Sequence, residues 1–397
     1  MTTLPGESRR LRSVQSPVIP VIADLIRAHP GTISLGQGVV GYAPPAQAAA
    51  AIDRFLADPL NHRYQPVAGI PPLVESLSLW MATEHGVRTE AEHGNRLMVT
   101  AGGNNAFLAA VLAIADPGDE VILPAPYYFN HEMAVTMASC RPVPVSTDSS
   151  HQLDLAAIKA AITPRTRAIV TVSPNNPTGA VYPAATLRAV NALCAERGLF
   201  HLSDEAYAPF TWDGAEQFSP ASLPGAAGHT ISLHSLSKSF GFASWRIGWL
   251  VFPAALESAL RKVQDTLVIC PPVVSQFAAV GALEAGGEWV RRQVAGIAEN
   301  RRILRAALQP LEEEGRVTVP PADGAFYFLL RARSTRPALE LAERLIREHG
   351  VAVIPGSAFG DMAGCSLRVA YGSLTPATAA EGIGRLVRGL RALAAAE

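Results

Sequence analysis

Short apolar segments alternate with longer amphipathic segments through the middle of the chain. The apolar segments have the length of strands and are residues 97–100, 121–123, 143–146, 168–172 and 200–203. The segments between them have helical spacing of apolar positions and are residues 104–115, 131–138, 153–162 and 184–197. Strands joined by helices of this length need crossover connections, which are right-handed and give a mostly parallel sheet. The pattern therefore predicts an α/β fold with helices flanking a mostly parallel sheet.

The same pattern continues with shorter sheets towards the C-terminus. Further strands are predicted at residues 230–236, 247–252, 316–319, 325–330, 351–354 and 366–370. Further helices are predicted at residues 21–28, 254–267, 274–283, 289–311, 338–349 and 375–394. We predict a large domain at residues 46–286 and a smaller α/β domain at 287–397. Residues 1–45 are predicted to form an N-terminal arm that adds a part to the smaller domain.

Composition narrows the class of protein. The chain has 397 residues, of which 49% are hydrophobic and 17% charged, and a formal net charge of −1. It can bury a large core, and it has no basic cluster that would indicate a nucleic-acid partner. Its four cysteines lie far apart without a C-x-x-C pair, so neither a disulfide framework nor a zinc site is indicated. No segment resembles a signal peptide or a membrane span, and we predict a cytoplasmic enzyme without a metal or a membrane partner.

One lysine stands in an unusual setting. The chain has 33 Lys and Arg residues, and only three of them are lysines. Lys238 follows a strand-like segment and lies between Ser235, Ser237 and Ser239, with Arg246 further along. Arginine cannot form a Schiff base, whereas a desolvated lysine near other cations can. This segment therefore predicts a phosphate site beside a reactive amine.

A glycine-rich segment nearer the N-terminus imitates another type of site. Residues 33–41, with the sequence ISLGQGVVG, match the G-x-G-x-x-G pattern of dinucleotide-binding loops. That pattern requires a helix to begin on the loop, so that the helix N-terminus faces the pyrophosphate. Here Tyr42-Ala-Pro-Pro follows, and the next helical segment begins near Ala46. We therefore do not expect a dinucleotide site.

Polar motifs follow several of the predicted strands. Gly102, Gly103 and Asn104 join a strand to a helix, where backbone N–H groups can converge on an anion. The sequence SPNNPTG at residues 173–179 predicts a rigid turn, and Tyr128 lies in the aromatic cluster that follows another strand. These motifs predict binding groups at the ends of the strands.

Two further motifs carry charged groups. Asp204 and Tyr207 form a D-x-x-Y sequence that directly follows the strand at residues 200–203. Arg368 lies in the middle of an apolar strand, where a buried cation is costly unless it is paired.

Together these motifs resemble, over nearly the whole chain and in the same order, the class I and II aminotransferases. These are enzymes of the aspartate aminotransferase fold (fold type I) that use pyridoxal 5′-phosphate (PLP). The sequences around Tyr128 and residues 35–40 look closest to the plant methionine–tryptophan aminotransferases and their bacterial relatives. The resemblance implies that Lys238 forms a Schiff base with PLP and shuttles a proton during catalysis. It also implies that Asp204 keeps the pyridine nitrogen of the cofactor protonated.

The remaining site residues also follow from the resemblance. Tyr207 and Asn176 are implied to bind the phenolic oxygen of the cofactor, and Tyr128 to stack on its ring. The implied phosphate-binding residues are Gly102, Gly103, Asn104, Ser235, Ser237 and Arg246. Arg368 is implied to hold the substrate carboxylate with help from Asn176, and Gly38 to approach the substrate with its backbone.

The resemblance also concerns Tyr64, and there it implies a second subunit. Tyr64 begins a sequence similar to the family pattern Y-x-x-x-x-G-x-x-x-L, in which the tyrosine reaches the cofactor phosphate of the other subunit. The resemblance thus implies a homodimer with shared active sites, acting on an amino acid and a 2-oxo acid.

Alternative reactions remain open from the residues alone. The same PLP site supports β- or γ-elimination, cyclisation or oxidation of an amino acid. A serine acyl hydrolase is also suggested by the S-x-x-K sequence at residues 235–238, but the chain has no S-D-N or K-T-G motif. The apolar residues Val39, Val40 and Tyr42 favour an apolar or aromatic amino-acid substrate.

Overall fold

The large sheet has seven strands and is parallel over most of its width. The computed structural model describes residues 6–362 and 364–393. The strand order is β2-β8-β7-β6-β5-β3-β4, and only β8 runs antiparallel to its neighbours. The strands are β2 (Asn95–Thr100), β3 (Glu120–Ala125), β4 (Arg141–Ser146), β5 (Thr166–Val172), β6 (Phe200–Asp204), β7 (Thr230–Ser235) and β8 (Gly248–Pro253). The predicted mostly parallel sheet is confirmed, and β8 is reversed because the connection from β7 carries no crossover helix long enough to return the chain.

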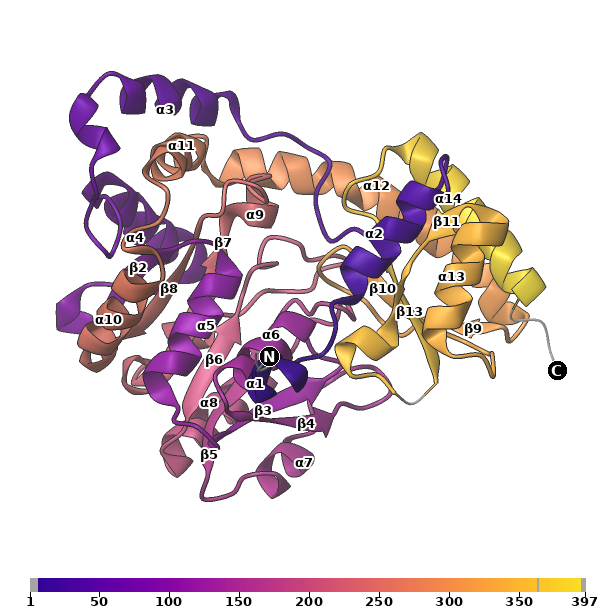
Figure 1. Ribbon diagram of the computed structural model, residues 1–397, viewed down its shortest axis with the longest axis horizontal. Coiled ribbons are helices and arrows are strands. Elements are labelled where there is room, and N and C mark those ends of the chain that lie inside the picture. Colours follow the sequence, from indigo (N-terminus) through magenta and orange to yellow (C-terminus); the bar gives the residue numbers. More distant parts are fainter. Residues whose placement is uncertain (1–5, 363, 394–397) are drawn as a thin grey trace, which may run out of the picture.

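Helices cover both faces of this sheet (Figure 1). The helices of this part are α3 (Ala46–Leu56), α4 (Pro71–His85), α5 (Gly103–Ile114), α6 (Phe129–Met137), α7 (Leu155–Ala160), α8 (Ala184–Arg197), α10 (Glu257–Val268) and α11 (Val273–Glu284), of which α3 packs on α11 and not on the sheet. Along β3, Leu123 packs in one hydrophobic cluster with Phe107 of α5, while Ile122 packs in another with Val190 of α8. Successive side chains of a strand point to opposite faces, so a strand buried on both faces is apolar at every position.

A second group of elements lies beside the large sheet, on the right in Figure 1. It contains a four-stranded antiparallel sheet in the order β12-β13-β10-β9 and a parallel pair β1-β11. Its strands are β1 (Ile33–Ser34), β9 (Val317–Thr318), β10 (Tyr327–Ala332), β11 (Val351–Ala352), β12 (Ile354–Pro355) and β13 (Cys365–Ala370). Its helices are α2 (Val18–Ala28), α13 (Ala338–His349) and α14 (Pro376–Leu393). We call this group the small lobe and the seven-stranded sheet with its helices the large lobe.

The long helix α12 (Gly286–Glu313) connects the two lobes. The remaining helical segments are short: α1 (Arg9–Arg12), α9 (Leu236–Ser239), η1 (Pro59–His62), η2 (Ala91–His93), η3 (Pro220–Ser222), η4 (Ala226–Gly228), η5 (Ala254–Leu256) and η6 (Gly356–Phe359). The α/β fold with a large and a smaller part is thus as predicted, whereas the exact domain boundaries stay predictions.

The prediction of one continuous strand at residues 351–354 was wrong. Residues 351–354 form two short strands, because β11 pairs with β1 and β12 pairs with β13 in a different sheet. The predicted last residue of the C-terminal helix, Ala394, lies outside the described residues.

The described part of the chain has no single helix long and apolar enough to cross a membrane, although the bent pair α10 and α11 passes that test together at an angle of 119°. All four cysteines are free.

Candidate active site

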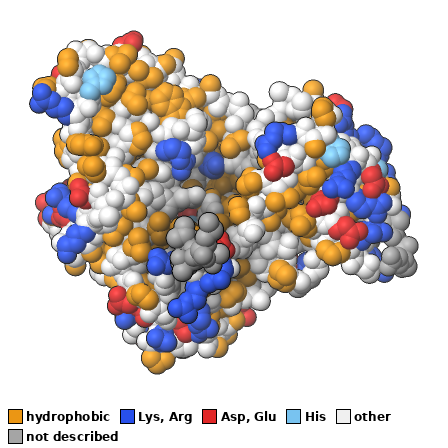
Figure 2. All heavy atoms as spheres, viewed as in Figure 1, with side chains coloured by type: hydrophobic (Ala, Val, Ile, Leu, Met, Phe, Trp, Pro, Cys, Tyr) orange, Lys and Arg blue, Asp and Glu red, His pale blue; other side chains and the backbone are white. Residues whose placement is uncertain are grey.

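A cavity of about 630 Å³ lies where the carboxyl ends of β5, β6 and β7 face the small lobe. In open α/β sheets this edge is the usual place for a ligand, because loops from neighbouring strands meet there. Figure 2 shows a hollow near the middle of this face with Lys and Arg side chains at its border. The lining includes these residues of the predicted site: Gly38, Gly103, Asn104, Tyr128, Asn176, Asp204, Tyr207, Ser235, Ser237, Lys238, Arg246 and Arg368.

Lys238 lies on the short helix α9, immediately after β7. Ser235 caps this helix, and its side chain accepts the backbone N–H of Ser237 at 3.1 Å. Lys238 Nζ donates a hydrogen bond to the carbonyl oxygen of Gly38 at 2.5 Å. Burial, followed by the positive charges of Arg368 and Arg246, lowers the pKa of Lys238 from 10.5 to about 8, although Asp204 acts in the opposite direction. A larger fraction of this amine is therefore neutral and nucleophilic near neutral pH than for an exposed lysine.

Arg246 and the start of α5 form a cradle for an anion. Gly102 precedes α5 with a φ of 84°, a conformation that favours glycine, and a Cβ at this position would overlap the guanidinium of Arg246. Arg246 donates through Nη1 to the carbonyl of Ala243 at 2.9 Å and through Nη2 to that of Ala101 at 3.4 Å. The helix N-terminus and the guanidinium both favour negative charge. This end of the cavity is suited to a phosphate group.

Asp204 is held from two sides at the end of β6. Its Oδ1 accepts the backbone N–H of Ala206 at 3.0 Å, and its Oδ2 lies 3.0 Å from Nε2 of His131. The His131 ring stacks on Phe107, with 3.9 Å between the ring centroids. These contacts orient a carboxylate that borders the cavity and can accept a hydrogen bond from a ligand.

Three side chains place hydroxyl and amide groups near Asp204. Asn176 Nδ2 donates to the hydroxyl of Tyr207 at 3.4 Å. Burial and the adjacent Tyr327 raise the pKa of Tyr207, so its hydroxyl remains protonated and can donate to a ligand. The Tyr128 hydroxyl accepts from Asn130 Nδ2 at 2.7 Å and donates to Asn104 Oδ1 at 3.3 Å. The last contact joins the aromatic cluster to the anion cradle.

Arg368 is a buried cation without an anionic partner in the described chain. Arg368 lies on β13 and is 3% exposed. Nη1 donates to Asn176 Oδ1 at 2.8 Å and Nη2 to the carbonyl of Gly36 at 2.7 Å, while Nε has no partner among the described residues. No described carboxylate lies within ion-pair distance of this guanidinium. Since an unpaired buried charge is costly, the arrangement is suited to an anionic ligand such as a carboxylate.

Two predicted residues do not line the cavity. Gly102 abuts Arg246 from behind, as described above. Tyr64 is 79% exposed and does not line the cavity of its own chain. The role predicted for Tyr64, to reach the cofactor phosphate of the other subunit, stays a prediction.

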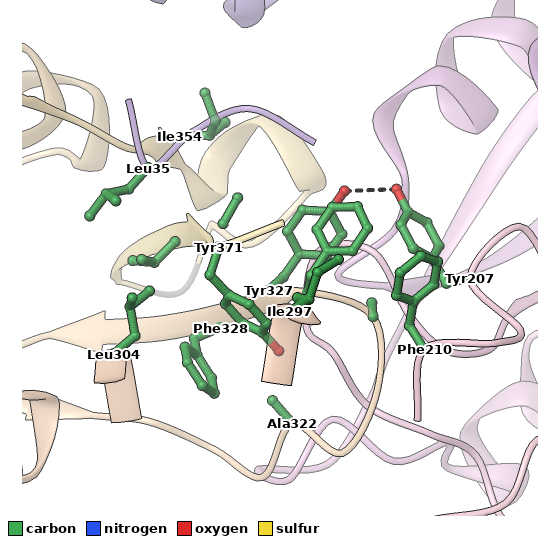
Figure 3. Close-up of a cluster of buried hydrophobic side chains, with 14 of the residues drawn as sticks. Leu35, Tyr207, Phe210, Ile297, Leu304, Ala322, Tyr327, Phe328, Ile354 and Tyr371 are labelled. Atoms are coloured by element: carbon green, nitrogen blue, oxygen red, sulfur yellow. Dashed lines mark hydrogen bonds between the residues drawn. The ribbon is translucent and has the colours of Figure 1, made fainter. Parts of the chain in front are cut away.

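The sequence prediction missed several cavity residues. The hydroxyl of Tyr327, on β10, lies 2.8 Å from that of Tyr207, as the dashed line in Figure 3 shows, and its ring lies under the guanidinium of Arg368 at 4.6 Å. The sequence prediction gives His131 no role beyond a helix; it does not line the cavity but contacts Asp204, and its position three residues after Tyr128 is the signal that could have found it. Helix α2 was predicted as part of an arm, yet Ile19, Ile22, Ala23 and Ile26 line the cavity. The apolar stripe of α2 was the available signal, because an amphipathic helix needs a surface to cover.

Comparisons with known proteins agree with this geometry. Residues 30–386 match the family model for aminotransferase class I and II. The chain is 31% identical over 395 residues to "Aromatic aminotransferase ISS1" of Arabidopsis thaliana, covering 97% of this chain and 96% of the relative. It is 33% identical over 372 residues to "Aromatic-amino-acid aminotransferase 2" of Thermococcus litoralis, covering 92% and 93%. The solved structure of Thermus thermophilus aspartate aminotransferase with maleate superposes with a TM-score of 0.88 at 31% identity, covering 97% of this chain and 100% of that one.

The chain belongs to the class I and II aminotransferases. It is an enzyme of fold type I that uses PLP to transfer an amino group between an amino acid and a 2-oxo acid. The relatives support amino-group transfer and not the alternatives of elimination, cyclisation or oxidation.

Proposed function

We propose that the amino donor is an apolar or aromatic L-amino acid. The observation that carries this proposal is the distribution of charge in the cavity. Among the described lining residues the cations are Lys238, Arg246 and Arg368, and each has one of the three tasks argued below. None of these lining cations is therefore left to bind a second carboxylate, such as the side chain of an acidic amino acid. The lining also has an apolar part, formed by Ile22 and Ile26 of α2 and by Val39.

The cavity residues fit PLP as the resident cofactor. The cradle at Gly102 excludes a side chain and presents Arg246 with the N-terminus of α5, which suits the phosphate. We propose that Gly103, Asn104, Ser235 and Ser237 complete the phosphate site, and that Tyr128 packs on the ring. We further propose that Asp204 binds the pyridine nitrogen and that Tyr207 and Asn176 bind the phenolic oxygen. When bound, the cofactor supplies an electron sink for the charge that develops at the substrate Cα.

The protein residues would then control the proton and the substrate. Arg368 holds the α-carboxylate with its planar guanidinium, which fixes the orientation of the bonds at Cα. Lys238 Nζ, when free and neutral, accepts the proton from Cα and later returns it to the reacting centre as a general acid. The backbone carbonyl of Gly38 holds this amine near the substrate, and the apolar side chains of α2 line one side of the cavity and limit the access of water there.

We also propose a cytoplasmic homodimer. Tyr64 is 79% exposed, and the exposed side chains of Leu56 and Leu60 lie on the same chain segment. Large apolar side chains gathered on a surface are typical of protein interfaces. In a dimer, Tyr64 could reach the phosphate site of the partner subunit. The four free cysteines agree with a reducing compartment.

The proposed donor class is tested by the visible absorption spectrum of the holoenzyme with single amino acids and no acceptor. We expect phenylalanine to convert the cofactor to its amino form faster than aspartate, and a 2-oxo acid to restore the first spectrum. Faster conversion by aspartate would contradict the proposed donor class. Light scattering at several protein concentrations tests the dimer independently.

A further inference from the structure

A second, smaller cavity of about 160 Å³ lies directly behind the cofactor site. Ala206 and Ser235 line both cavities. The small cavity is bordered by His85 at the end of α4, Glu205 after β6 and His234 on β7. One ligand atom from each of these three residues lies within 4.8 Å of the others. The proposed reaction uses none of the three side chains.

Glu205 is a buried carboxylate that lacks a permanent cation. Its side chain is fully buried, and its Oε1 accepts hydrogen bonds from the hydroxyls of Ser203 at 3.0 Å and Ser219 at 2.9 Å. Its Oε2 lies 3.5 Å from Nδ1 of His85. No described Lys or Arg lies within ion-pair distance of this carboxylate. A buried anion of this kind requires a compensating positive charge.

The two histidines face each other across the same space. Their ring centroids are 4.8 Å apart in an edge-to-face arrangement. The His234 ring also stacks on Trp249, with the centroids 5.2 Å apart and the planes at 12°. The stack on Trp249 orients the His234 imidazole, whereas the His85 imidazole comes from the last residue of α4.

Two further polar atoms of the cavity lining are buried without a partner among the described residues. They are Oε1 of Gln217 and Nε1 of Trp249. Leaving such an atom unsatisfied costs about 1–3 kcal/mol, so atoms of this kind indicate an additional ligand or an ordered water. Oε1 of Gln217 can accept a hydrogen bond from a water held in this cavity, whereas the indole N–H of Trp249 is a donor and cannot bind a cation.

We propose that His85, Glu205 and His234 bind one divalent cation of the zinc class. Two imidazoles and one carboxylate are a known ligand set for Zn²⁺, and nitrogen ligands disfavour Mg²⁺ and Ca²⁺. With bond lengths of about 2.0–2.1 Å, ligand atoms of a tetrahedral ion lie about 3.4 Å apart. The 3.5 Å between His85 and Glu205 already matches this spacing, and a separation of up to 4.8 Å closes with a shift of up to about 1.4 Å. A water held by Gln217 would take the fourth position.

The ion would tie together three elements that support the active site. Glu205 directly follows Asp204, and His234 directly precedes Ser235. The end of α4 would thus be bonded to the ends of β6 and β7 from behind. This role is structural and does not depend on the reaction that the enzyme catalyses.

The test uses the chelator-treated, re-purified holoenzyme and Zn²⁺ alone. We expect calorimetric titration and elemental analysis after dialysis to give one tightly bound Zn²⁺ per chain, with a higher melting temperature. His85→Gln should weaken binding by at least about 100-fold, since even losing a residue that merely orients a ligand costs about 10- to 100-fold. The matched control is His93→Gln, an exposed histidine of η2, which should bind Zn²⁺ like the wild type.

A second variant guards against loss of folding. Glu205→Gln removes the charge while keeping the shape, and its melting temperature in chelator shows whether the fold survives. With Co²⁺ as the probe, the wild type should gain visible absorption bands of a tetrahedral nitrogen and oxygen site, which the apo-site holoenzyme lacks. Absence of stoichiometric binding in the wild type, or binding unchanged by His85→Gln, would overturn the proposal and leave the aminotransferase function untouched.

Discussion

Around Arg246 the active-site cavity is built from two local segments of the large lobe, whereas around Arg368 it is built from distant parts of the chain. Arg246 donates to Ala243, only three positions away, and Ser235 bonds to Ser237 within one turn. Arg368, in contrast, contacts Gly36 across 332 positions and Asn176 across 192. The first region is a preformed anion cradle, and the second exists only when the small lobe lies against the large one.

This difference separates two kinds of function. A cradle made from a helix N-terminus and a capped turn keeps its shape whatever the small lobe does, which suits permanent retention of a cofactor. A region assembled from α2, β10 and β13 of the small lobe and Asn176 of the large lobe changes whenever the lobes move, which suits a substrate that must enter and leave. Substitutions in the two regions should therefore affect different measured quantities.

The largest effect is expected at Lys238, which borders both regions. Lys238→Ala should lower kcat by at least about 10⁴-fold, because the general acid–base group and the covalent attachment are lost together. The melting temperature should change little. Lys262→Ala, on the exposed side of α10, is the matched lysine control and should keep full turnover. Undiminished turnover in Lys238→Ala would refute the assigned role.

Arg368→Lys tests the assembled region. A lysine keeps the charge but loses the two-pronged contact, so kcat/KM should fall about 100-fold, in line with about 3 kcal/mol for a charge-assisted hydrogen bond. Steady-state kinetics and the cofactor absorbance check this prediction. The absorbance should remain that of the wild type, and a loss of bound cofactor would show that the two regions are not separate.

Gly102→Ala tests the preformed cradle. Because the new Cβ overlaps the Arg246 guanidinium, the Kd of the cofactor should rise on the order of tenfold. Gly198→Ala is a close control, since Gly198 also has a positive φ but no neighbouring atom within 4 Å of the position that a Cβ would take. Fluorescence titration of the apoenzymes should show weaker binding for Gly102→Ala alone, and equal weakening in both would point to backbone strain.

Ile22→Ala addresses the apolar wall of the assembled region. Ile22 lines the cavity and is 2% exposed, whereas Val21 on the same helix is 43% exposed and does not line it. The loss of buried methylene groups should lower kcat/KM for phenylalanine about fivefold, or about 1 kcal/mol, with little effect on alanine as donor. Val21→Ala should behave like the wild type. Equal losses for both donors would argue against contact between this wall and the substrate side chain.

The smallest effect is a change in the pH dependence of Lys238, whose pKa is influenced by an arginine from each region. Burial and the guanidinium groups of Arg368 and Arg246 lower the pKa of Lys238 to about 8. The neutral amine increases with pH, so uptake of PLP by the apoenzyme should accelerate with a midpoint near that value. Arg368→Gln removes one of the positive charges and should raise the midpoint by up to about one pH unit. A wild-type midpoint near 10.5, the ordinary pKa of lysine, would contradict this account.

Each half of the cradle was predictable from sequence because it is a local turn, whereas the contact of Arg246 with Ala101 across 145 positions is tertiary. The serines around Lys238 and the glycines before α5 lie in strand-to-helix connections, where a few adjacent residues determine the backbone conformation. The alternation of apolar segments likewise predicted the mostly parallel sheet. It did not predict the reversal of β8, because strand direction depends on the connection and the pairing partner.

Other features were decided only by the tertiary structure. Tyr327 and α2 border the cavity, and His131 contacts Asp204, because the fold brings distant segments together, as in the hydroxyl pair of Tyr207 and Tyr327 across 120 positions. The cluster of His85, Glu205 and His234 has no spacing signal for the same reason. The amino-acid sequence thus determined the elements, the cofactor lysine motif and the local anion cradle, since these depend on neighbouring residues. The packing of the small lobe on the large one decided which distant side chains meet, because only folding brings them within hydrogen-bonding distance.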